Sequence, residues 1–287
     1  MNSKITIFLF CSLLSHLAWS QAPAVLEDDK NEQIFNSYLQ KNINKKQYRL
    51  DSLLIQTALF FLDTPYVAST LEGNENEQLV VNLQVFDCTT FVENCLALSR
   101  TLHTDHPNFG SFQKELQTIR YRDGIIDGYT SRLHYTSDWI TNNQKAKIVE
   151  DKTQAIGGII LSSHINFMST HPESYRHLSE NPENTEKMRQ IEDSINNRTY
   201  YYIPKEKIRN CEKHIKPGDI ICFVTSIKGL DISHLGIAYR KNRILTFIHA
   251  STSGQKVLIN PVSIADYCKN IKNNKGIIVL KVNHEIF

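Results

Sequence analysis

Residues 86–91, Phe86-Asp87-Cys88-Thr89-Thr90-Phe91, introduce the helix around which we expect this chain to fold. Between Thr89 and Leu102, apolar residues recur at helical spacing, which is typical of a helix that packs one face on a core. That stripe contains Phe91, Cys95 and Leu98. Asp87 is a residue type that caps helix N-termini through its side-chain oxygen, so the helix is predicted to begin directly after it.

Cys88 lies at the start of this predicted helix, where backbone N–H groups lack partners and the helix dipole is positive. Both effects favour a thiolate, so we expect the thiol pKa to lie below its usual value of about 8.5. A thiolate is a nucleophile, and the same N–H groups can stabilise the oxyanion formed when an amide carbonyl is attacked. The competing interpretation is a buried structural cysteine, which is how we interpret Cys95.

Two histidines near predicted strand ends supply a candidate base and its partner. His234 lies in Ser233-His234-Leu235-Gly236-Ile237-Ala238, and His249 lies in Phe247-Ile248-His249-Ala250-Ser251. Their separation of fifteen residues suits two strands paired in a hairpin, which would bring the rings side by side. A cysteine–histidine pair needs a third group to hold the base in its tautomer, and His249 is the candidate. For each histidine alone, a satisfied or surface side chain is the alternative.

The order of patterns along the chain predicts an α+β fold, because helical patterns come first and strand patterns come later. Besides the helix after Asp87, helical spacing occurs at Ile34–Leu39, Leu50–Leu62 and Phe112–Tyr121. Short β-rich runs occupy Ile220–Thr225, His234–Tyr239, Ile244–His249, Lys256–Ile259 and Gly276–Val282, with a turn at Lys241-Asn242. The segment at about 142–215 is predicted to be a helical or irregular insertion that forms a lid or a wall of the substrate site.

Composition narrows the classes of protein that this chain can be. Its 287 residues, 41% of them hydrophobic, suit one domain over residues 21–287. The 32 basic and 30 acidic residues give a net charge of +2, and no block of five Lys or Arg occurs, so nothing indicates a nucleic-acid partner. The six cysteines form no C-x-x-C pair. Without Cys11 five remain, an odd number that leaves at least one thiol outside any intrachain disulfide.

Residues 1–20 are predicted to be a signal peptide. Lys4 gives a positive start, Ile5–Leu14 is an apolar run, and Ala18-Trp19-Ser20 offers small residues where a signal peptidase cuts. A buried N-terminal helix is the alternative. The apolar run is too short to cross a bilayer of roughly 30 Å, and no run of 18 apolar residues follows it. We therefore expect export to the periplasm or the extracellular space, without a membrane span.

Six stretches, in order along the chain, resemble the NlpC-type peptidases, a bacterial branch of papain-like cysteine hydrolases. Within that superfamily the chain looks most like the muramoyl-L-alanine amidase-like branch. The stretches are Thr64-Pro65-Tyr66-Val67-Ala68 with Leu71-Glu72, then 86–93, Arg132-Leu133-His134-Tyr135-Thr136-Ser137-Asp138-Trp139, Lys216-Pro217-Gly218-Asp219-Ile220, 233–237 and Ile248-His249-Ala250-Ser251. The resemblance implies a papain-like core in which the nucleophile helix packs on an antiparallel sheet.

The resemblance also implies roles for individual residues. Cys88 matches the nucleophile, His234 the base and His249 the third polar residue of a catalytic triad, with no cofactor and no metal. Residues implied to contact substrate are Tyr66, Asp87, Arg132, Tyr135, Trp139 and Ser233. Arg132 could pair with a carboxylate of the substrate, and Tyr135 and Trp139 could stack on a sugar, although packing is their alternative role. Thr89-Thr90 replaces the Ser-Gly that usually follows the nucleophile, which fits the amidase-like branch.

The activity implied is hydrolysis of the amide between N-acetylmuramic acid and L-alanine, with peptidoglycan or muropeptides as substrate. The first alternative is a stem-peptide endopeptidase that cuts between D-glutamate and the diamino acid. A zinc hydrolase built on Cys88, His234 and His249 lacks an H-E-x-x-H motif, and a serine hydrolase lacks G-x-S-x-G. A non-catalytic wall-binding module is the remaining alternative. The sequence does not indicate an oligomeric state.

Overall fold

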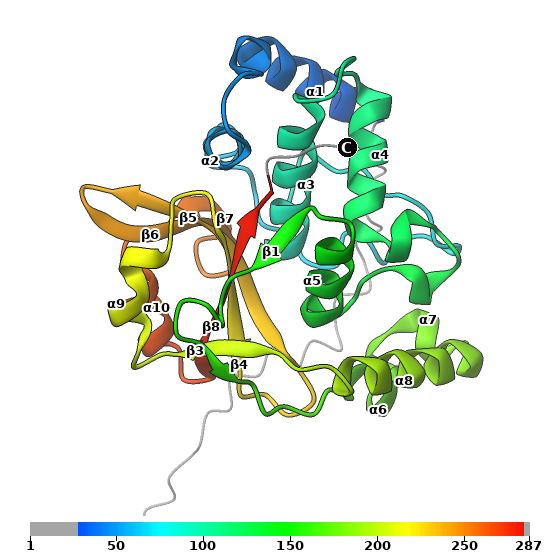
Figure 1. The fold of residues 1–287 in the computed structure, drawn as a ribbon. Helices are drawn as coiled ribbons and strands as arrows, with labels where there is room; N and C mark the ends of the chain where they lie inside the picture. Colours follow the sequence, from blue (N-terminus) through cyan, green and yellow to red (C-terminus); the bar gives the residue numbers. More distant parts are fainter. Residues whose placement is uncertain (1–27, 284–287) are drawn as a thin grey trace, which may run out of the picture.

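A computed structural model describes residues 28–283 and shows an α+β arrangement around one antiparallel sheet (Figure 1). The strands of the sheet follow the order β2-β3-β8-β4-β5-β6-β7, and β1 pairs with β8 outside this path. The first helices gather over one face of the sheet, and α9 and α10 lie over the other (Figure 1). The predicted fold class, α+β with a helix packed on an antiparallel sheet, is therefore confirmed.

The helices predicted in the first half of the chain are present. They are α1 (Asp28–Asn42), α2 (Leu50–Phe60), α3 (Cys88–Thr101) and α4 (Phe109–Arg120), followed by α5 (Thr136–Lys145). Short 3-10 turns cover Ile43–Lys45, Arg122–Gly124, Tyr129–Ser131, Pro172–Ser174 and Glu212–His214. Helix α3 begins directly after Asp87, because Asp87 and Thr90 form a reciprocal capping box that satisfies two backbone N–H groups. An equivalent box of Asn108 and Ser111 begins α4.

The five strands predicted after Pro217 are also present. They are β4 (Ile220–Thr225), β5 (Ile232–Lys241), β6 (Ile244–Ser251), β7 (Lys256–Ile259) and β8 (Asn274–Val282). Strands β5 and β6 form a hairpin in which Lys241 pairs with Ile244. The two turn residues, Asn242 and Arg243, have φ values of 50° and 70°, the left-handed geometry that tight two-residue hairpins require. The predicted hairpin is confirmed, but its turn lies one residue later than the predicted Lys241-Asn242, because Lys241 still pairs with Ile244.

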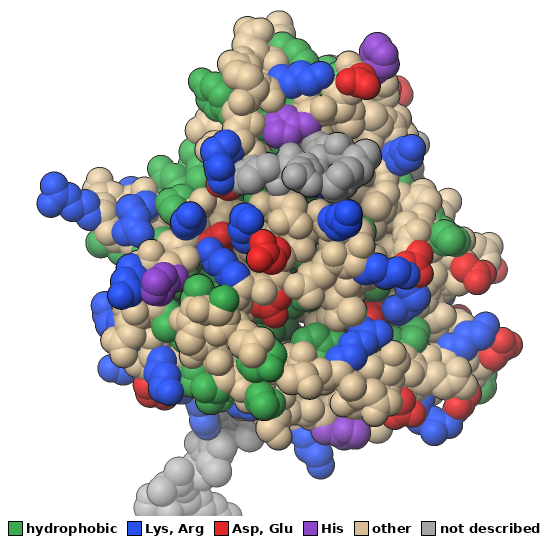
Figure 2. All heavy atoms as spheres, viewed as in Figure 1, with side chains coloured by type: hydrophobic (Ala, Val, Ile, Leu, Met, Phe, Trp, Pro, Cys, Tyr) green, Lys and Arg blue, Asp and Glu red, His purple; other side chains and the backbone are tan. Residues whose placement is uncertain are grey.

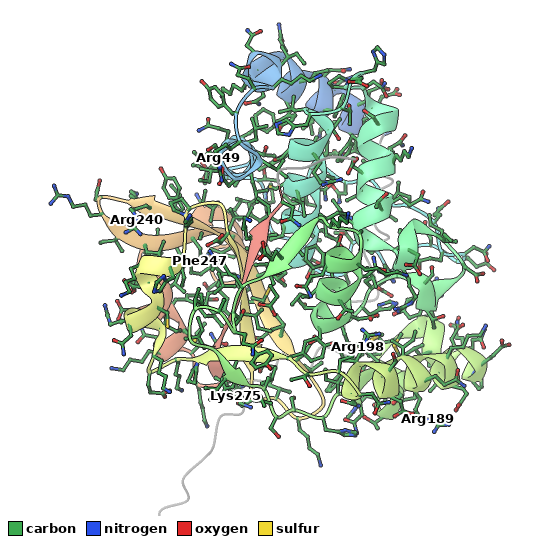
Figure 3. The ribbon with its side chains drawn as sticks, viewed as in Figure 1. Arg49, Arg189, Arg198, Arg240, Phe247 and Lys275 are labelled. Atoms are coloured by element: carbon green, nitrogen blue, oxygen red, sulfur yellow. The ribbon has the colours of Figure 1, made fainter. Side chains whose placement is uncertain are left out.

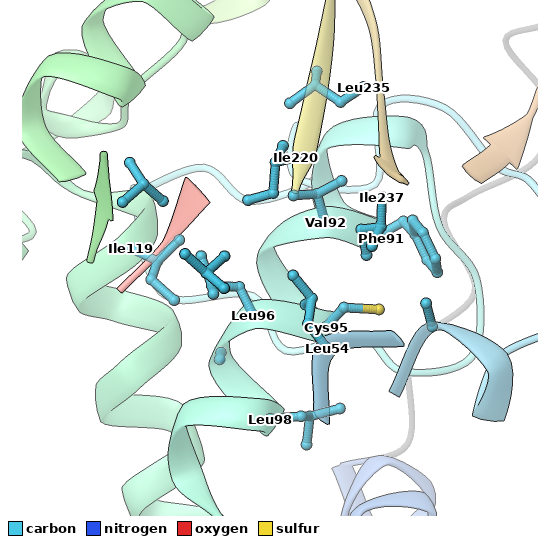
Figure 4. Close-up of a cluster of buried hydrophobic side chains, with 14 of the residues drawn as sticks. Leu54, Phe91, Val92, Cys95, Leu96, Leu98, Ile119, Ile220, Leu235 and Ile237 are labelled. Carbon is cyan, nitrogen blue, oxygen red and sulfur yellow. The ribbon is translucent and has the colours of Figure 1, made fainter. Parts of the chain in front are cut away.

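Alternate residues of β5 serve different faces of the sheet. Leu235 and Ile237 join the main core, which α2 and α3 complete from above. Figure 4 shows this core, in which Cys95 lies with Leu54 near the strand that carries Ile237. The intervening residues, His234 and Ala238, face the second core under α9 (Ile208–Cys211) and α10 (Ile264–Asn270). The period of two along a strand thus places His234 on the face opposite Leu235.

The middle segment differs from its prediction, because it contributes strands as well as helices. Its helices are α6 (Phe167–Thr170), α7 (Arg176–Ser179) and α8 (Pro182–Asn196). Its strands are β1 (Val149–Asp151), β2 (Ile159–Ile160) and β3 (Tyr201–Pro204), and both β1 and β3 pair with β8. Strands of two to four residues are too short to display a period of two, so the sequence pattern missed them. The insertion is therefore part of the sheet.

The insertion is also held to α5 by a buried carboxylate. Asp138 accepts hydrogen bonds from Arg122 at 2.7 Å and from Arg198, directly beyond α8, at 2.9 Å. Figure 3 labels Arg198 where the segment leaving α8 meets α5. Elsewhere on the face drawn in Figure 2, basic and acidic side chains are interspersed.

Three further predictions concern the signal peptide, a membrane span and the cysteines. The predicted signal peptide, residues 1–20, lies outside the described residues. Among residues 28–283, no helix is both long and apolar enough to cross a membrane. The five cysteines of this range, Cys88, Cys95, Cys211, Cys222 and Cys268, are all free thiols.

Candidate active site

Cys88 is the first residue of α3, and its backbone is held from both sides. On the preceding side, Phe86 forms a parallel bridge with Tyr66, supported by a hydrogen bond from Phe86 N to the Pro65 carbonyl at 3.1 Å. On the following side, Asp87 Oδ1 accepts hydrogen bonds from the Thr90 N–H and hydroxyl, each at 2.8 Å. The cap and the bridge together fix the position of the sulfur at the start of the helix.

His234 on β5 and His249 on β6 form a direct contact. His234 Nε2 lies 2.6 Å from His249 Nδ1, and the ring planes are almost perpendicular, at 88°. The predicted side-by-side placement of these two rings is confirmed. Gly236 makes room for it, because a Cβ at this position would lie 2.5 Å from Phe247 Cδ2 and 3.3 Å from His249 Cβ.

Aromatic side chains surround this histidine pair on the second-core side. The Tyr267 ring of α10 lies 6.0 Å from His234 and 5.8 Å from His249, measured between ring centroids. Phe247, labelled on the sheet in Figure 3, packs 4.5 Å from His249. An apolar, water-poor environment of this kind favours neutral imidazoles.

The Cys88 sulfur and the histidine pair converge at the start of β5. The backbone N–H of Leu235, the residue directly after His234, points at the Cys88 thiol. Burial raises the pKa of Tyr267, which lies against both histidines, and that of Tyr66, and the proximity of Cys88 adds to each rise. Among the described residues, no hydrogen bond joins the thiol to either imidazole. The geometry therefore brings the three predicted catalytic residues to one region without bonding the sulfur to the base.

Burial controls the protonation of these groups. Burial, and then the charge of Asp87, raises the pKa of the Cys88 thiol to about 12, while the Leu235 N–H and the Thr89 hydroxyl oppose the rise. Burial and the neighbouring His249 lower the pKa of His234 to about 3. Burial likewise lowers the pKa of His249 to about 4, opposed by Asn260. The resting site therefore holds a neutral thiol and two neutral imidazoles.

This protonation state corrects the expectation of a thiol with a lowered pKa. The helix N-terminus is present as predicted, but desolvation of the sulfur outweighs the stabilisation that the N–H groups give to a thiolate. A neutral thiol requires a base that removes its proton as it attacks, whereas a preformed thiolate would not.

A pocket of about 130 Å³ opens beside Cys88, and three parts of the chain line it. The start of β5 supplies Asp231 and Ser233, and the stretch before α5 supplies His134 and Tyr135. The insertion supplies Met168 and Tyr175. The expectation that the insertion and the 132–139 stretch form walls near the nucleophile agrees with this lining.

Arg132, expected to pair with a substrate carboxylate, is instead paired within the chain. It is buried, and its guanidinium contacts Glu72 at 2.8 Å and Glu77 at 3.3 Å while lying over the Tyr129 ring. A guanidinium removed from water needs a carboxylate partner that is always present, and the loop that follows Tyr66 provides two. Its position therefore corresponds to a structural ion pair.

Tyr135 and Trp139 also differ from the expectation that their faces are open to a sugar. The Tyr135 hydroxyl donates to Glu192 Oε1 at 2.7 Å and accepts from the Met168 N–H at 2.8 Å, so it ties the stretch before α5 to α8 and α6. Trp139 is 2% exposed and belongs to the main core. Tyr135 lines the pocket with its hydroxyl already paired, and the buried Trp139 ring is not open to a sugar.

The other predicted substrate residues lie close to Cys88. Tyr66 is partly buried beside the thiol, and the Thr252 hydroxyl is its hydrogen-bond partner. Ser233 lines the pocket and donates weakly to the Phe223 carbonyl and to Asn274 Oδ1, at 3.3 and 3.2 Å. Asp87 acts as the helix cap.

Sequence reasoning did not select the histidine and the carboxylate that line the pocket, His134 and Asp231. His134 Nε2 lies 2.8 Å from the Tyr129 carbonyl, which can only accept, so Nδ1 is left as an acceptor. Burial and Arg132 lower the pKa of His134 well below its usual value. Asp231 accepts from the Ser137 N–H at 2.6 Å and so caps α5. The signal for His134 was its place inside the 132–139 stretch, whereas nothing in the sequence marked Asp231.

Comparison with known proteins places this arrangement among related structures. A family model described as N-acetylmuramoyl-L-alanine amidase-like matches residues 56–277. A crystal structure of an N-acetylmuramoyl-L-alanine amidase from Bacteroides uniformis is 40% identical, with a TM-score of 0.78, covering 82% of this chain and 99% of its own. A structure from Bacteroides fragilis, provisionally named a xylanase, is 41% identical with a TM-score of 0.76, covering 79% and 100%.

A more distant structure extends the similarity beyond Bacteroides. A protein from Legionella pneumophila is 25% identical, with a TM-score of 0.68, covering 91% of this chain and 96% of its own. A search of curated proteins finds no match.

Proposed function

This chain belongs to the N-acetylmuramoyl-L-alanine amidase-like family, and from that premise we propose that it is a cysteine amidase of the bacterial cell wall. The bond cut is the amide between N-acetylmuramic acid and L-alanine in peptidoglycan or muropeptides. The observation that carries this proposal is the convergence of Cys88, at the start of α3, with the His234–His249 pair at the start of β5, where Tyr267 lies close to all three residues. A helix-borne cysteine beside an antiparallel sheet also supports an NlpC-type papain-like ancestry.

In the proposed reaction, the Cys88 sulfur attacks the lactyl carbonyl of the muramic acid. His234 Nδ1 accepts the thiol proton during the attack, because its Nε2 is already engaged with His249. Backbone N–H groups at the start of α3 stabilise the oxyanion of the tetrahedral intermediate. The imidazolium then returns the proton to the leaving alanine nitrogen, and water hydrolyses the acyl-enzyme.

The pocket chemistry favours amide cleavage over glycoside cleavage, the reaction suggested by the name of the Bacteroides fragilis structure. Glycosidases use two carboxyl groups about 5–9.5 Å apart. Among the described residues that line the pocket beside Cys88, Asp231 is the single carboxylate, and its oxygens accept backbone N–H groups of Ser137 and Ile232. A thiol near a histidine pair is instead typical of enzymes that catalyse acyl transfer.

Purified muropeptides digested with the wild-type protein and read by mass spectrometry test this proposal. We expect a peptide-free disaccharide and a peptide with a free alanine amine. Release of a fragment ending in L-alanyl-D-glutamate would instead identify the endopeptidase alternative. Cys88→Ala should abolish product, while Cys95→Ala, on the same helix but inside the core, should retain it. Undiminished product from Cys88→Ala would reject the proposed nucleophile and favour a different site or a binding role.

Location remains a prediction that rests on residues 1–20. The test is fractionation of cells that produce the full chain, combined with N-terminal sequencing of the mature protein. We expect a shortened protein outside the cytoplasm that begins after Ser20.

A further inference from the structure

The far nitrogen of His249 has no assigned role in the proposed reaction. His249 is only 2% exposed, and its Nε2 is buried without a hydrogen-bond partner among the described residues. Most buried polar atoms of folded proteins are paired, because an unpaired one forfeits the hydrogen bonds that water would have supplied. We therefore expect a hydrogen-bonding side chain among the residues packed around His249 Nε2.

Asn260 occupies that position, one residue beyond β7. Its backbone N–H donates to the Phe247 carbonyl at 2.8 Å, and its carbonyl accepts from the Thr246 hydroxyl at 2.8 Å. Both partners belong to β6, the strand that carries His249. The Asn260 residue is 6% exposed, and its side chain is the hydrogen-bonding neighbour that partly offsets the lowered pKa of His249.

The orientation of the Asn260 amide follows from its other contact. Asn260 Nδ2 donates to the Val262 carbonyl at 2.9 Å, and a carbonyl can only accept, so the nitrogen end of the amide is committed to Val262. The end that remains for His249 is Oδ1, which is an acceptor. An acceptor beside His249 Nε2 selects the form of the imidazole that carries its proton on that nitrogen.

We propose that Asn260 is a positioning residue whose Oδ1 accepts the Nε2 proton of His249 and thereby fixes the tautomers of both histidines. With its proton on Nε2, His249 presents a bare Nδ1 to His234, 2.6 Å away, so His234 must donate from its own Nε2. The proton of His234 is then on Nε2, and its Nδ1 has a free lone pair. This inference rests on the proposed function, since it explains how His234 is kept ready to accept the thiol proton.

The opposite tautomer pair would leave the site inactive. If His249 carried its proton on Nδ1, it would donate to His234 Nε2, and the proton of His234 would move to Nδ1. His234 could then not accept a proton from Cys88 through Nδ1. Asn260 discriminates between the two arrangements because only one of them gives its Oδ1 a donor. Losing that acceptor should lower kcat by about 10-fold, the worth of one buried hydrogen bond between neutral groups, with little change in KM.

Three variants test the proposal. Asn260→Leu keeps the approximate size and removes the acceptor, whereas Asn260→Asp keeps an acceptor in the same place. Asn42→Leu is a matched control, since Asn42 is also buried and also donates to a carbonyl, that of Tyr38, but lies at the end of α1. We expect kcat to fall for Asn260→Leu, to recover for Asn260→Asp and to persist for Asn42→Leu.

A substrate-independent readout separates this inference from the proposed function. In protein labelled with ¹⁵N-histidine, two-bond ¹H–¹⁵N spectra report which ring nitrogen carries the proton. We expect Nε2–H on both His234 and His249 in the Cys88→Ala protein, and a mixture of tautomers when Asn260→Leu is added. A wild-type spectrum with Nδ1–H on His249, or an unchanged spectrum in folded Asn260→Leu, would overturn the inference whether or not the protein cuts muropeptides. The wild-type spectrum decides even if Asn260→Leu fails to fold.

Discussion

The region around Cys88 has two sides, here called walls, that use their polar side chains differently. One is the catalytic wall, formed by α3 and the β5–β6 hairpin. Its polar atoms face one another but remain chemically available, as with the Cys88 thiol and the His234–His249 pair. The other is the supporting wall, formed by the 132–139 stretch and the insertion. Its polar groups are already paired within the protein, as with Arg132 and Tyr135. The difference teaches that a motif rich in charged and aromatic residues can be a support for an active site.

The largest difference between the two walls should be in how much a substitution lowers catalytic activity. His234→Gln removes the base, so we expect kcat/KM to fall at least 10³-fold, or about 4 kcal/mol in transition-state stabilisation. The free energy of unfolding should change far less, because the glutamine amide can still meet His249. Muropeptide turnover and thermal denaturation, measured on the same preparation, check this expectation. A loss of activity that merely follows a loss of folded protein would contradict it.

On the supporting wall, a substitution should lower stability strongly and activity only slightly. Arg132→Met leaves Glu77 buried without its cation, so we expect a loss of about 3–5 kcal/mol in the free energy of unfolding. Below its lowered melting temperature, the variant should retain most of its turnover per folded molecule. Arg189→Met is the control, because Arg189 is an exposed residue of α8 that pairs with the exposed carboxylate of Glu186, and we expect a change below about 1 kcal/mol. Equal stability of the two variants would contradict a structural role for Arg132.

Acid should act on the catalytic wall through its two neutral imidazoles. Their pKa values are lowered to about 3 and about 4, whereas imidazoles of the unfolded chain titrate near 6.5. Between these values the unfolded chain binds more protons than the folded one, so the free energy of unfolding falls as pH decreases from about 6.5 towards 4. At pH 5 each imidazole should remove about 2 kcal/mol.

Urea denaturation at pH 7 and pH 5 measures this effect. The doubly substituted protein, His234→Gln with His249→Gln, should show a correspondingly shallower decline over the same interval. An equally steep decline would assign the acid sensitivity to other groups.

The smallest effect should come from one hydroxyl on the supporting wall. Tyr135→Phe removes the donor to Glu192 and the acceptor for the Met168 N–H, so we expect a loss of about 1–3 kcal/mol in stability. Tyr175 lines the same pocket, but its hydroxyl has no hydrogen-bond partner among the described residues. Tyr175→Phe should therefore lower the free energy of unfolding by less than about 0.5 kcal/mol. Chemical denaturation of both variants checks this contrast, and a larger loss for Tyr175→Phe would reverse it.

The catalytic wall was largely predictable because local patterns specify it. Asp87 marked the start of α3, β-rich runs marked the positions of β4 to β8, and a spacing of fifteen residues placed His234 beside His249. These features depend on residues that are neighbours along the chain or across one hairpin. Short-range rules of capping, periodicity and turn geometry are sufficient to predict them.

The supporting wall and the thiol pKa could not be predicted in the same way. The carboxylates that pair with Arg132 lie some sixty residues earlier in a polar loop, and no local pattern connects the two segments. Trp139 reads as an exposed aromatic or a core residue until the packing of α5 is known. The Cys88 pKa depends on how completely the fold removes water from the sulfur, which sequence spacing does not report.

The position of β8 has a consequence for how the molecule comes into being. This strand, the last one among the described residues, lies between β3 and β4 and also pairs with β1, so three earlier strands lack a partner until it is in place. Because β8 is synthesised after all three partners, the sheet under α3 cannot close until β8 has left the ribosome. Such distant pairings slow folding, so the nascent chain should stay open for longer than one built from local contacts. Deleting residues 274–282 should therefore leave a chain that chaperones retain.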